Sequence, residues 1–280
     1  MKNFILSAFT DEYSTDFDKQ IEAAKLFGFD MIELRGADGA NVAAMTLDQI
    51  RGYAEKLSDN GIGVSSIGSP LGKIALDGDM DAHMESARKI FEFANILGAS
   101  NIRMFSFYGP EGTPVTACRQ QVIDALGRMI DLAKAANVTL CHENEAKIYG
   151  DIPERCLELM SIFNGDLKCV FDMGNFVLEE VNAWDAFQML KDHIRYFHIK
   201  DSLAAGAVVP PGKGEAQIQR ILLDYAADRD NTLITLEPHL QTFGGLNALV
   251  GKSFDNPYKY PDCETAFADA VVKLKELIAY

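Results

Sequence analysis

The sequence predicts a (β/α)8 barrel, and three observations favour this fold class. Short apolar runs alternate with longer stretches of 3.6-residue apolar periodicity. Eight such units in 280 residues average 35 residues each, and a barrel of this type takes about 250 residues. A doubly wound open sheet usually carries a glycine-rich turn after its first strand. Here that turn reads Thr10-Asp11-Glu12, so the barrel is preferred.

The elements follow in chain order from this alternation. The expected strands are Phe4–Phe9, Met31–Arg35, Gly63–Ile67, Asn101–Phe107, Val138–Glu143, Lys168–Asp172, Tyr196–Lys200 and Leu233–Glu237. The expected helices are Asp16–Leu26, Leu47–Ser58, His83–Leu97, Arg119–Ala136, Ile152–Phe163, Ala183–Asp192, Glu215–Ala227 and Glu264–Ile278. Glycine commonly ends a helix, and four of the expected helices are followed by one, at Gly28, Gly61, Gly98 and Gly165.

The loops richest in glycine and proline all follow expected strands. They are Tyr108–Pro114, Ala204–Gly214 and Gly244–Pro261. In a barrel these connections lie on the face that carries active sites, so we expect them to form lids or to set specificity. Within the second loop, the stretch Pro210–Glu215 lacks the spacing of a phosphate-binding Walker motif and is read as a rigid turn. No linker divides the chain, which predicts one domain over residues 1–280.

Charge and cysteine usage exclude several classes of protein. The net charge is −15, from 26 basic and 41 acidic residues, which argues against a nucleic-acid partner. The five cysteines are scattered without a CxxC pair, a pattern typical of free thiols in a reducing compartment. No apolar stretch reaches the roughly 18 residues that a membrane span needs, and the N-terminus lacks a cleavage-type signal. We therefore expect a cytoplasmic protein that binds no membrane.

Each of the last four expected strands ends on a side chain that can bind a metal ion. These residues are Glu143 in LCHEN, Asp172 in VFDMGN, His198 in YFHIKD and Glu237 in ITLEPH. Their spacings of 29, 26 and 39 residues each correspond to about one strand–helix unit. The carboxyl ends of neighbouring parallel strands converge at the mouth of a barrel. The four side chains are therefore expected to meet there.

Strand alternation supports this convergence. Glu143 shares its face with Cys141, and His198 shares its face with Tyr196, whereas the opposite faces are apolar and suit contact with the outer helices. Three carboxylates and one imidazole suit Mn²⁺, Mg²⁺, Co²⁺ or Zn²⁺, with positions left for a substrate. The alternative is four separate polar residues bonded to loops. Four residues in phase on consecutive strands favour the metal site.

Two arginines and one further glutamate also point inward by alternation. Arg103 needs a carboxylate partner if it is buried, and Glu33 or Glu143 can serve. Arg103 is accordingly either structural or a substrate contact. Glu33 and Arg35 form either an internal ion pair at the barrel mouth or a contact to a substrate hydroxyl.

Lys200 and His239 each lie two residues beyond one of the four ligand-type residues and share its face. Both are therefore candidate substrate contacts. Lys147 and Tyr149, on the loop after the fifth strand, are candidates to close over the site. Glu145 has the same alternation as Glu143 but already lies in the loop, so Glu143 is the preferred ligand.

The series HENE, FDMGN, FHIKD and LEPH resembles the xylose-isomerase-like barrels that include ketose 3-epimerases, inosose dehydratases and hydroxypyruvate isomerases. The resemblance covers essentially the whole chain. It implies a (β/α)8 barrel that binds one divalent cation through Glu143, Asp172, His198 and Glu237, with Mn²⁺ expected first and Mg²⁺, Co²⁺ or Zn²⁺ as alternatives. Family members commonly form dimers or tetramers, so a homodimer or homotetramer is expected.

One position departs from the family pattern. Many family epimerases carry a histidine three residues after the strand-six aspartate, where it helps to hold the substrate. Here that residue is Asn175, which can form hydrogen bonds but cannot titrate, so the substrate's identity is not carried over and Asn175 is a candidate substrate contact. More distant relatives are DNA-repair endonucleases with extra histidine ligands, which this chain lacks.

The implied activity is that of a metal-dependent isomerase or epimerase acting on a ketose or a related sugar or polyol. Glu143 and Glu237 would take and return a proton around a metal-stabilised enediolate. One alternative is a lyase or dehydratase that acts on a keto-inositol or keto-glycoside with the same residues. Another is a barrel that binds a sugar without converting it.

Overall fold

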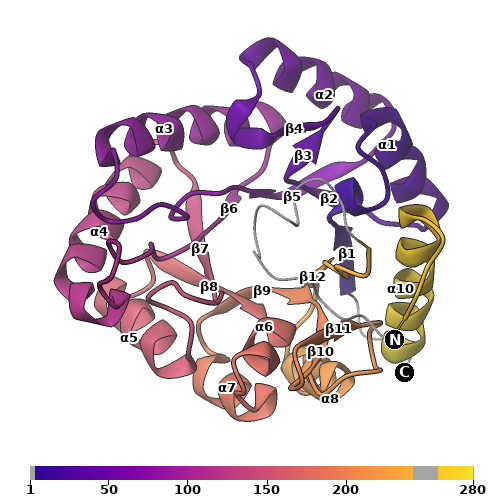
Figure 1. Cartoon of the computed structure of the whole chain (residues 1–280). Helices are drawn as coiled ribbons and strands as arrows, with labels where there is room; N and C mark the ends of the chain where they lie inside the picture. The colour runs from indigo at the N-terminus through magenta and orange to yellow at the C-terminus, as the bar shows by residue number, and fades with distance from the viewer. Residues whose placement is uncertain (1–3, 242–257, 280) are drawn as a thin grey trace.

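The computed structural model describes residues 4–241 and 258–279, and it confirms the predicted barrel. Eight parallel strands follow one another in the order β1-β12-β9-β8-β7-β6-β5-β2. The two ends of this order, β1 and β2, lie side by side and nearly close the ring (Figure 1). The strands are β1 (Phe4–Ala8), β2 (Met31–Leu34), β5 (Gly63–Gly68), β6 (Asn101–Met104), β7 (Thr139–Glu143), β8 (Leu167–Asp172), β9 (Ile194–Ile199) and β12 (Thr232–Leu236).

Helices cover the outside of the barrel, and all eight helices predicted from the sequence are present (Figure 1). They are α1 (Phe17–Leu26), α2 (Leu47–Asp59), α3 (Met80–Leu97), α4 (Arg119–Ala135), α5 (Pro153–Phe163), α7 (Ala183–Leu190), α8 (Ile218–Tyr225) and α10 (Cys263–Ile278). The glycines predicted to end helices, Gly28, Gly61, Gly98 and Gly165, all have φ angles between 64° and 96°. Glycine adopts this left-handed conformation without a steric cost.

Two helices begin three residues away from their predicted positions, and local hydrogen bonds explain both differences. The helix α3 begins three residues earlier than predicted, because the side chain of Asp79 accepts a 2.9 Å hydrogen bond from Ala82 N and caps its first turn. The helix α8 begins three residues later than predicted. The backbone amides of Glu215 and Ala216 are bonded to the carbonyl of Ser202 and the carboxylate of Asp201, so they belong to the preceding loop.

Several short elements of the described residues, most of them at the carboxyl ends of the strands, were not predicted, because they are too short to carry a periodic pattern. The helix α6 follows β8 directly, and two hairpins and four 3₁₀ turns occupy other loops. These elements are α6 (Met173–Leu178), β3 (Gly36–Ala37), β4 (Ala40–Asn41), β10 (Asp201–Leu203), β11 (Ala207–Val209), η1 (Thr10–Glu12), η2 (Val42–Ala44), η3 (Val115–Cys118) and η4 (Ala226–Asp228).

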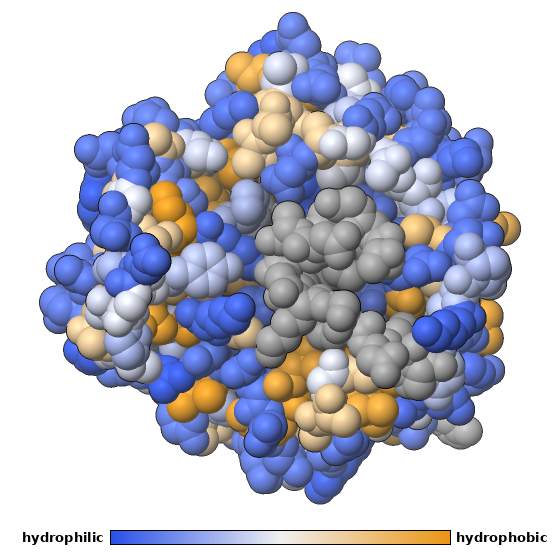
Figure 2. Space-filling model, in the orientation of Figure 1, coloured by the Kyte–Doolittle hydropathy of each residue, from blue (hydrophilic) through white to orange (hydrophobic). Residues whose placement is uncertain are grey.

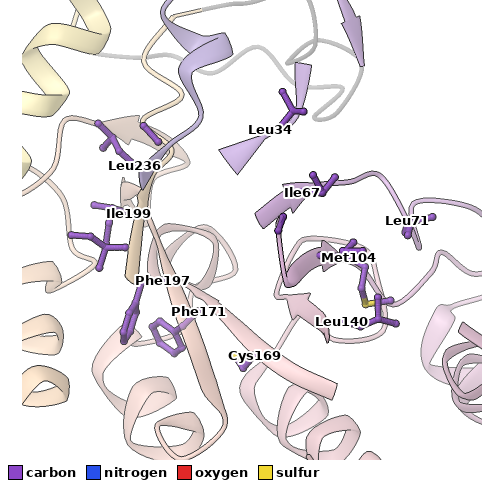
Figure 3. Close-up of a cluster of buried hydrophobic side chains, with 14 of the residues drawn as sticks. Leu34, Ile67, Leu71, Met104, Leu140, Cys169, Phe171, Phe197, Ile199 and Leu236 are labelled. Carbon is purple, nitrogen blue, oxygen red and sulfur yellow. The ribbon is translucent and has the colours of Figure 1, made fainter. Parts of the chain in front are cut away.

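The apolar core has two parts, which confirm the predicted strand alternation. The larger part lies between the strands and the helices and includes Phe171, Phe197 and Leu236 (Figure 3). A smaller cluster, made of Cys141, Val170 and Tyr196 with Leu233, comes from the opposite faces of the strands and fills the barrel interior. Burying each large apolar side chain contributes about 1.5–3 kcal/mol. Apolar packing on both faces of the sheet therefore stabilises the barrel below its mouth.

The loop before α8 folds around one buried carboxylate. Asp201 accepts hydrogen bonds from the backbone amides of Ser202, Gly212, Gly214 and Ala216, at 2.7–3.1 Å. A Cβ on Gly214 would lie 2.2 Å from Asp201 Oδ1, so only glycine allows this close approach. Because the amides point at Asp201, they are not presented to a phosphate group. This geometry agrees with the rigid turn expected for this stretch.

Other expectations concern the surface and the cysteines. Figure 2 shows hydrophilic residues over much of the face of Figure 1. All five cysteines are free, and four of them are buried. Over residues 4–241 and 258–279, no helix is both long and apolar enough to cross a membrane. The predicted loop Gly244–Pro261 lies outside the described residues except for its last four positions.

Candidate metal centre

The four residues predicted to bind a metal ion meet at the barrel mouth. Glu143 and Asp172 are the last residues of β7 and β8, His198 lies in β9, and Glu237 directly follows β12. One potential ligand atom from each residue lies within 4.8 Å of those of the other three, and all four residues are buried. The sequence therefore identified a set of side chains that the fold brings together.

Strand register staggers these side chains by at most one inward position from strand to strand, and Glu143 is paired with Val170, one inward position below Asp172. Asp172 is paired with His198 across β8 and β9, and His198 is paired with Thr235 across β9 and β12. Glu237 lies on the same face as Thr235, one inward position further towards the mouth. Asp172 also caps the unpredicted helix α6, because its Oδ1 accepts a 2.7 Å hydrogen bond from Asn175 N. The cap fixes the carboxylate and leaves Oδ2 to face the cluster.

His198 lies at the centre of the cluster, and its two ring nitrogens have different surroundings. Nε2 lies 3.1 Å from Glu33 Oε2. Nδ1 lies 3.2 Å from both Glu143 Oε1 and Glu237 Oε2. Within the described part of the chain, neither Nδ1 nor Glu143 Oε2 makes a well-aligned hydrogen bond, although both are buried. Buried polar atoms are normally satisfied, so this arrangement fits a cation between the imidazole and the carboxylates.

The pKa shifts follow from burial and from this crowding of charges. Burial raises the pKa of Glu143, but the nearby His198 and Arg103 outweigh it and bring the pKa to about 2. Burial dominates at Asp172 and raises its pKa to about 7, against the opposing effect of Lys200. Burial lowers the pKa of His198, but Glu33, Glu143 and other carboxylates raise it well above its ordinary value. A cation that binds here must therefore displace protons.

Lys200 and Asn175 complete the side of the cluster formed by α6. The ammonium of Lys200 lies 2.8 Å from Asp172 Oδ2 and 3.2 Å from Glu237 Oε2, and it donates a further 3.2 Å hydrogen bond to Asn175 Oδ1. Asn175 Nδ2 lies 3.4 Å from Glu143 Oε1. Burial raises the pKa of Glu237, but Lys200 and other cationic partners hold this pKa well below its usual range. Both predicted contact residues therefore reach the cluster.

Arg103 and Arg35 supply fixed positive charge on the other side of the mouth. Arg103 Nη1 lies 3.3 Å from Glu143 Oε2, so Glu143 is the carboxylate partner that the sequence required. Arg35 Nη1 donates a 3.0 Å hydrogen bond to Glu237 Oε1. Arg35 also donates two 2.8 Å hydrogen bonds to the carboxylate of Asp11. Among the described residues, these carboxylates are partners of Arg35, whereas Glu33 faces His198. These contacts take the place of the ion pair between Arg35 and Glu33 that the sequence allowed.

Sequence reasoning missed one acidic residue beside the site. Glu12, in the 3₁₀ turn η1 after β1, lies 3.2 Å from Arg35 Nη2 and 3.4 Å from Nε2 of His239. The same His239 nitrogen lies 3.4 Å from Glu237 Oε1, so the predicted contact residue His239 also belongs to the mouth. Burial raises the pKa of Glu12 to about 8, although Arg35 opposes the shift. The pair Asp11-Glu12 directly after the first strand was the available signal.

An aromatic side chain forms one wall of the cluster. The buried ring of Phe9, directly after β1, packs edge-on against His198 with ring centroids 5.1 Å apart. The guanidinium of Arg35 lies 4.3 Å from the centre of the same ring. A Cβ on Gly68 would lie 2.5 Å from the Phe9 ring, so glycine at this position makes room for it. Phe9 therefore restricts how the His198 ring can rotate.

Three residues considered from the sequence do not belong to the four-residue cluster. Glu145 accepts a 3.2 Å hydrogen bond from Lys73 and is not among the four clustered candidate ligands. The hydroxyl of Tyr149 donates to Glu158 on α5, so it points away from the mouth. Lys147 has a positive φ angle of 69°, and among the described residues its side chain makes no hydrogen bond or ion pair with the cluster. The preference for Glu143 over Glu145 agrees with this geometry.

The sequence model of the xylose isomerase-like TIM barrel family matches residues 21–239 of the chain. This span contains all four clustered candidate ligands. No curated protein matches the chain in sequence.

Solved structures share the fold at low sequence identity. The chain is similar to D-allulose 3-epimerase from Methylomonas sp. in complex with D-allulose, with a TM-score of 0.76 and 16% identity over 99% of this chain and 98% of that chain. It is similar to the probable 3-DHS dehydratase AsbF from Bacillus anthracis, with a TM-score of 0.70 and 20% identity over 89% and 96% of the two chains. It is also similar to the IOLI protein with a binding zinc atom, with a TM-score of 0.72 and 17% identity over 100% and 98%.

Proposed function

Because the chain belongs to the xylose isomerase-like TIM barrel family, we propose that it is a divalent-metal-dependent isomerase or epimerase of a ketose or related polyol ketone. The buried cluster of Glu143, Asp172, His198 and Glu237 is the observation that carries the proposal. The names of the similar structures, an allulose epimerase and a probable dehydratase, support an enzyme that modifies sugars or related compounds.

The donor set suits a hard or borderline divalent ion. Three carboxylates and one imidazole nitrogen would hold it, and Mn²⁺ is the proposed resident ion, with Mg²⁺, Co²⁺ and Zn²⁺ able to use the same donors. When bound, such an ion supplies Lewis-acid polarisation of a carbonyl group, which acidifies the neighbouring C–H bond.

Glu143 and Glu237 are the proposed acid–base pair. They come from β7 and β12, and each has one oxygen 3.2 Å from His198 Nδ1, so they face the same point from two directions. Each retains a second oxygen that can carry a proton. If one carboxylate moves the proton between neighbouring carbons, the result is isomerisation. If the two act on opposite faces of one carbon, the result is epimerisation.

The remaining polar residues of the mouth would bind and orient the substrate. Lys200 and Asn175 present an ammonium and an amide beside Asp172 and Glu237. His239 lies on the other side of Glu237. Arg103 keeps Glu143 ionised, and this electrostatic role is proposed in addition to any substrate contact.

The proposal is tested by metal analysis followed by a substrate panel in D₂O. The purified chain should bind about one divalent ion, and with it catalyse deuterium incorporation beside the carbonyl of one ketose or polyol ketone. Glu145→Gln is the matched control, because this glutamate lies two residues beyond Glu143 but outside the cluster. It should retain turnover within a few-fold of the wild type.

The products separate the possible reactions. An epimer or an aldose–ketose pair supports the proposal, whereas an unsaturated or dehydrated product would assign a lyase that uses the same residues. Stoichiometric binding of a sugar without exchange at any carbon would contradict enzymatic function and leave a sugar-binding barrel.

A further inference from the structure

Glu33 is a carboxylate in the interior of the barrel, in an environment that strongly disfavours isolated charge. It lies on β2, and its side chain is fully buried. Its Oε2 faces His198 Nε2 at 3.1 Å, and its Oε1 accepts a 2.9 Å hydrogen bond from the Tyr196 hydroxyl. Burying a carboxylate without partners costs several kcal/mol. Both oxygens of Glu33 therefore have partners, and one of these partners is a proposed metal ligand.

The local fold directs Glu33 to this place. The pairing of β2 with β5 shifts register between Ile32 and Glu33, so that Glu33 lies opposite Ser66 instead of Ser65. Such irregularities re-aim side chains near functional sites. Ser66 Oγ lies 3.0 Å from the hydroxyl oxygen of Tyr196, whose single proton is donated to Glu33. A buried chain of contacts thus runs from Ser66 through Tyr196 and Glu33 to His198.

We infer that Glu33 is a positioning residue that holds the proton of His198 on Nε2 and aims Nδ1 at the carboxylates of the cluster. The inference rests on the proposed function, because it treats His198 as a metal ligand. In protein metal sites a carboxylate commonly accepts the second ring N–H of a histidine ligand, which fixes the tautomer and increases the basicity of the coordinating nitrogen. The rings of Phe9 and Tyr196 pack edge-on against His198 at 5.1 and 5.4 Å, so the orientation is also held sterically.

The substitution Glu33→Gln isolates this role. Glutamine keeps the shape of the side chain, but it has one acceptor oxygen and an amide that donates, whereas both Glu33 oxygens face donors. Loss of such a supporting carboxylate weakens metal affinity by about 10–100-fold. Tyr196→Phe is the matched variant, because it removes a donor to Glu33 and leaves the contact between Glu33 and His198. Its effect should lie between those of the wild type and Glu33→Gln.

The experiment titrates the full chain with Co²⁺ and follows both the dissociation constant and the visible absorption spectrum. The inference expects Glu33→Gln to bind about 10–100-fold more weakly, with a shifted Co²⁺ spectrum. Equal affinity and an unchanged spectrum for this variant would overturn it. If the wild type binds no Co²⁺, Mn²⁺ or Zn²⁺, the proposed function fails instead, so the two failures are distinguishable.

A second measurement needs no variant and so does not depend on how Glu33→Gln folds. In the Zn²⁺-loaded wild type, long-range ¹⁵N–¹H spectra report which nitrogen of each histidine carries a proton. His198 should show a protonated Nε2 and an unprotonated Nδ1. A protonated Nδ1 would reverse the predicted tautomer and overturn the inference.

Discussion

Glu143 and Glu237 have unequal surroundings, and this predicts unequal roles in proton transfer. In Glu237, Oε2 faces His198 and also lies 3.2 Å from Lys200 Nζ, and the second oxygen, Oε1, accepts a 3.0 Å hydrogen bond from Arg35. The second oxygen of Glu143, Oε2, is 3.3 Å from Arg103 and makes no well-aligned hydrogen bond to a residue that the structure describes. Charge-assisted hydrogen bonds stabilise the ionised form and reduce its basicity. Glu143 is therefore the stronger base and should remove the first proton from the substrate.

The perturbation is Glu143→Gln compared with Glu237→Gln, both at saturating Mn²⁺. An amide keeps an oxygen for the ion but cannot accept a proton at neutral pH. General-base catalysis contributes about 10²–10⁴-fold, which corresponds to about 2.7–5.5 kcal/mol of barrier. Glu143→Gln should lose this factor both in turnover and in deuterium exchange at the substrate carbon. Glu237→Gln should lose turnover but retain exchange on one face.

The assay is NMR of the substrate in D₂O, with metal affinity measured separately for each variant so that metal loss is not mistaken for loss of the base. Deuterium exchange at the wild-type rate in Glu143→Gln would show that Glu143 does not remove the first proton. Loss of exchange in Glu237→Gln with exchange retained in Glu143→Gln would make Glu237 the stronger base.

Three further predictions follow from the same site. Burial raises the pKa of Asp172 to about 7, and the surrounding carboxylates raise the pKa of His198 against the effect of burial. Metal binding must therefore release protons, and metal affinity should rise with pH between about 6 and 8. A metal affinity that calorimetry finds independent of pH would contradict this. Asp172→Asn and His198→Ala should weaken metal binding while circular dichroism stays that of a folded barrel, because neither residue belongs to the apolar clusters; unfolding of His198→Ala would show a structural role instead. Gly68→Ala should displace Phe9, whose ring would lie 2.5 Å from the new Cβ. The melting temperature and the metal affinity should therefore fall together. If neither value changes, the ring moves aside without cost.

The barrel and the clustering of its four candidate metal ligands were predictable because both depend on regular periods. Strand alternation sends Glu143 and His198 inward, and one strand–helix unit between ligands brings them to neighbouring strand ends. No such period governs Glu12, which reaches the site through the short 3₁₀ turn η1. The contact of Glu33 with His198 also depends on closure between β2 and the strands opposite. Pairings across a barrel interior join residues 165 positions apart, and no local pattern specifies them.

A second cluster at the mouth, made of Glu12, Glu237 and His239, was not predicted as a group. It explains how several carboxylates coexist at the mouth of the barrel. Glu12, Glu237 and His239 also lie close enough together to hold an ion. However, the guanidinium of Arg35 already contacts both carboxylates, at 3.2 and 3.0 Å, and it remains charged at all ordinary pH values. Arg35 is part of the protein chain, and its guanidinium therefore supplies the positive charge that a second bound ion would otherwise supply. The cluster around His198 Nδ1 differs, because this nitrogen and Glu143 Oε2 are buried without well-aligned hydrogen bonds to any described residue. The groups of this cluster also hold exchangeable protons. The mouth therefore has two parts with different sources of positive charge. Beside Glu12 the charge is the fixed guanidinium of Arg35, and beside His198 it is the proposed exchangeable metal ion.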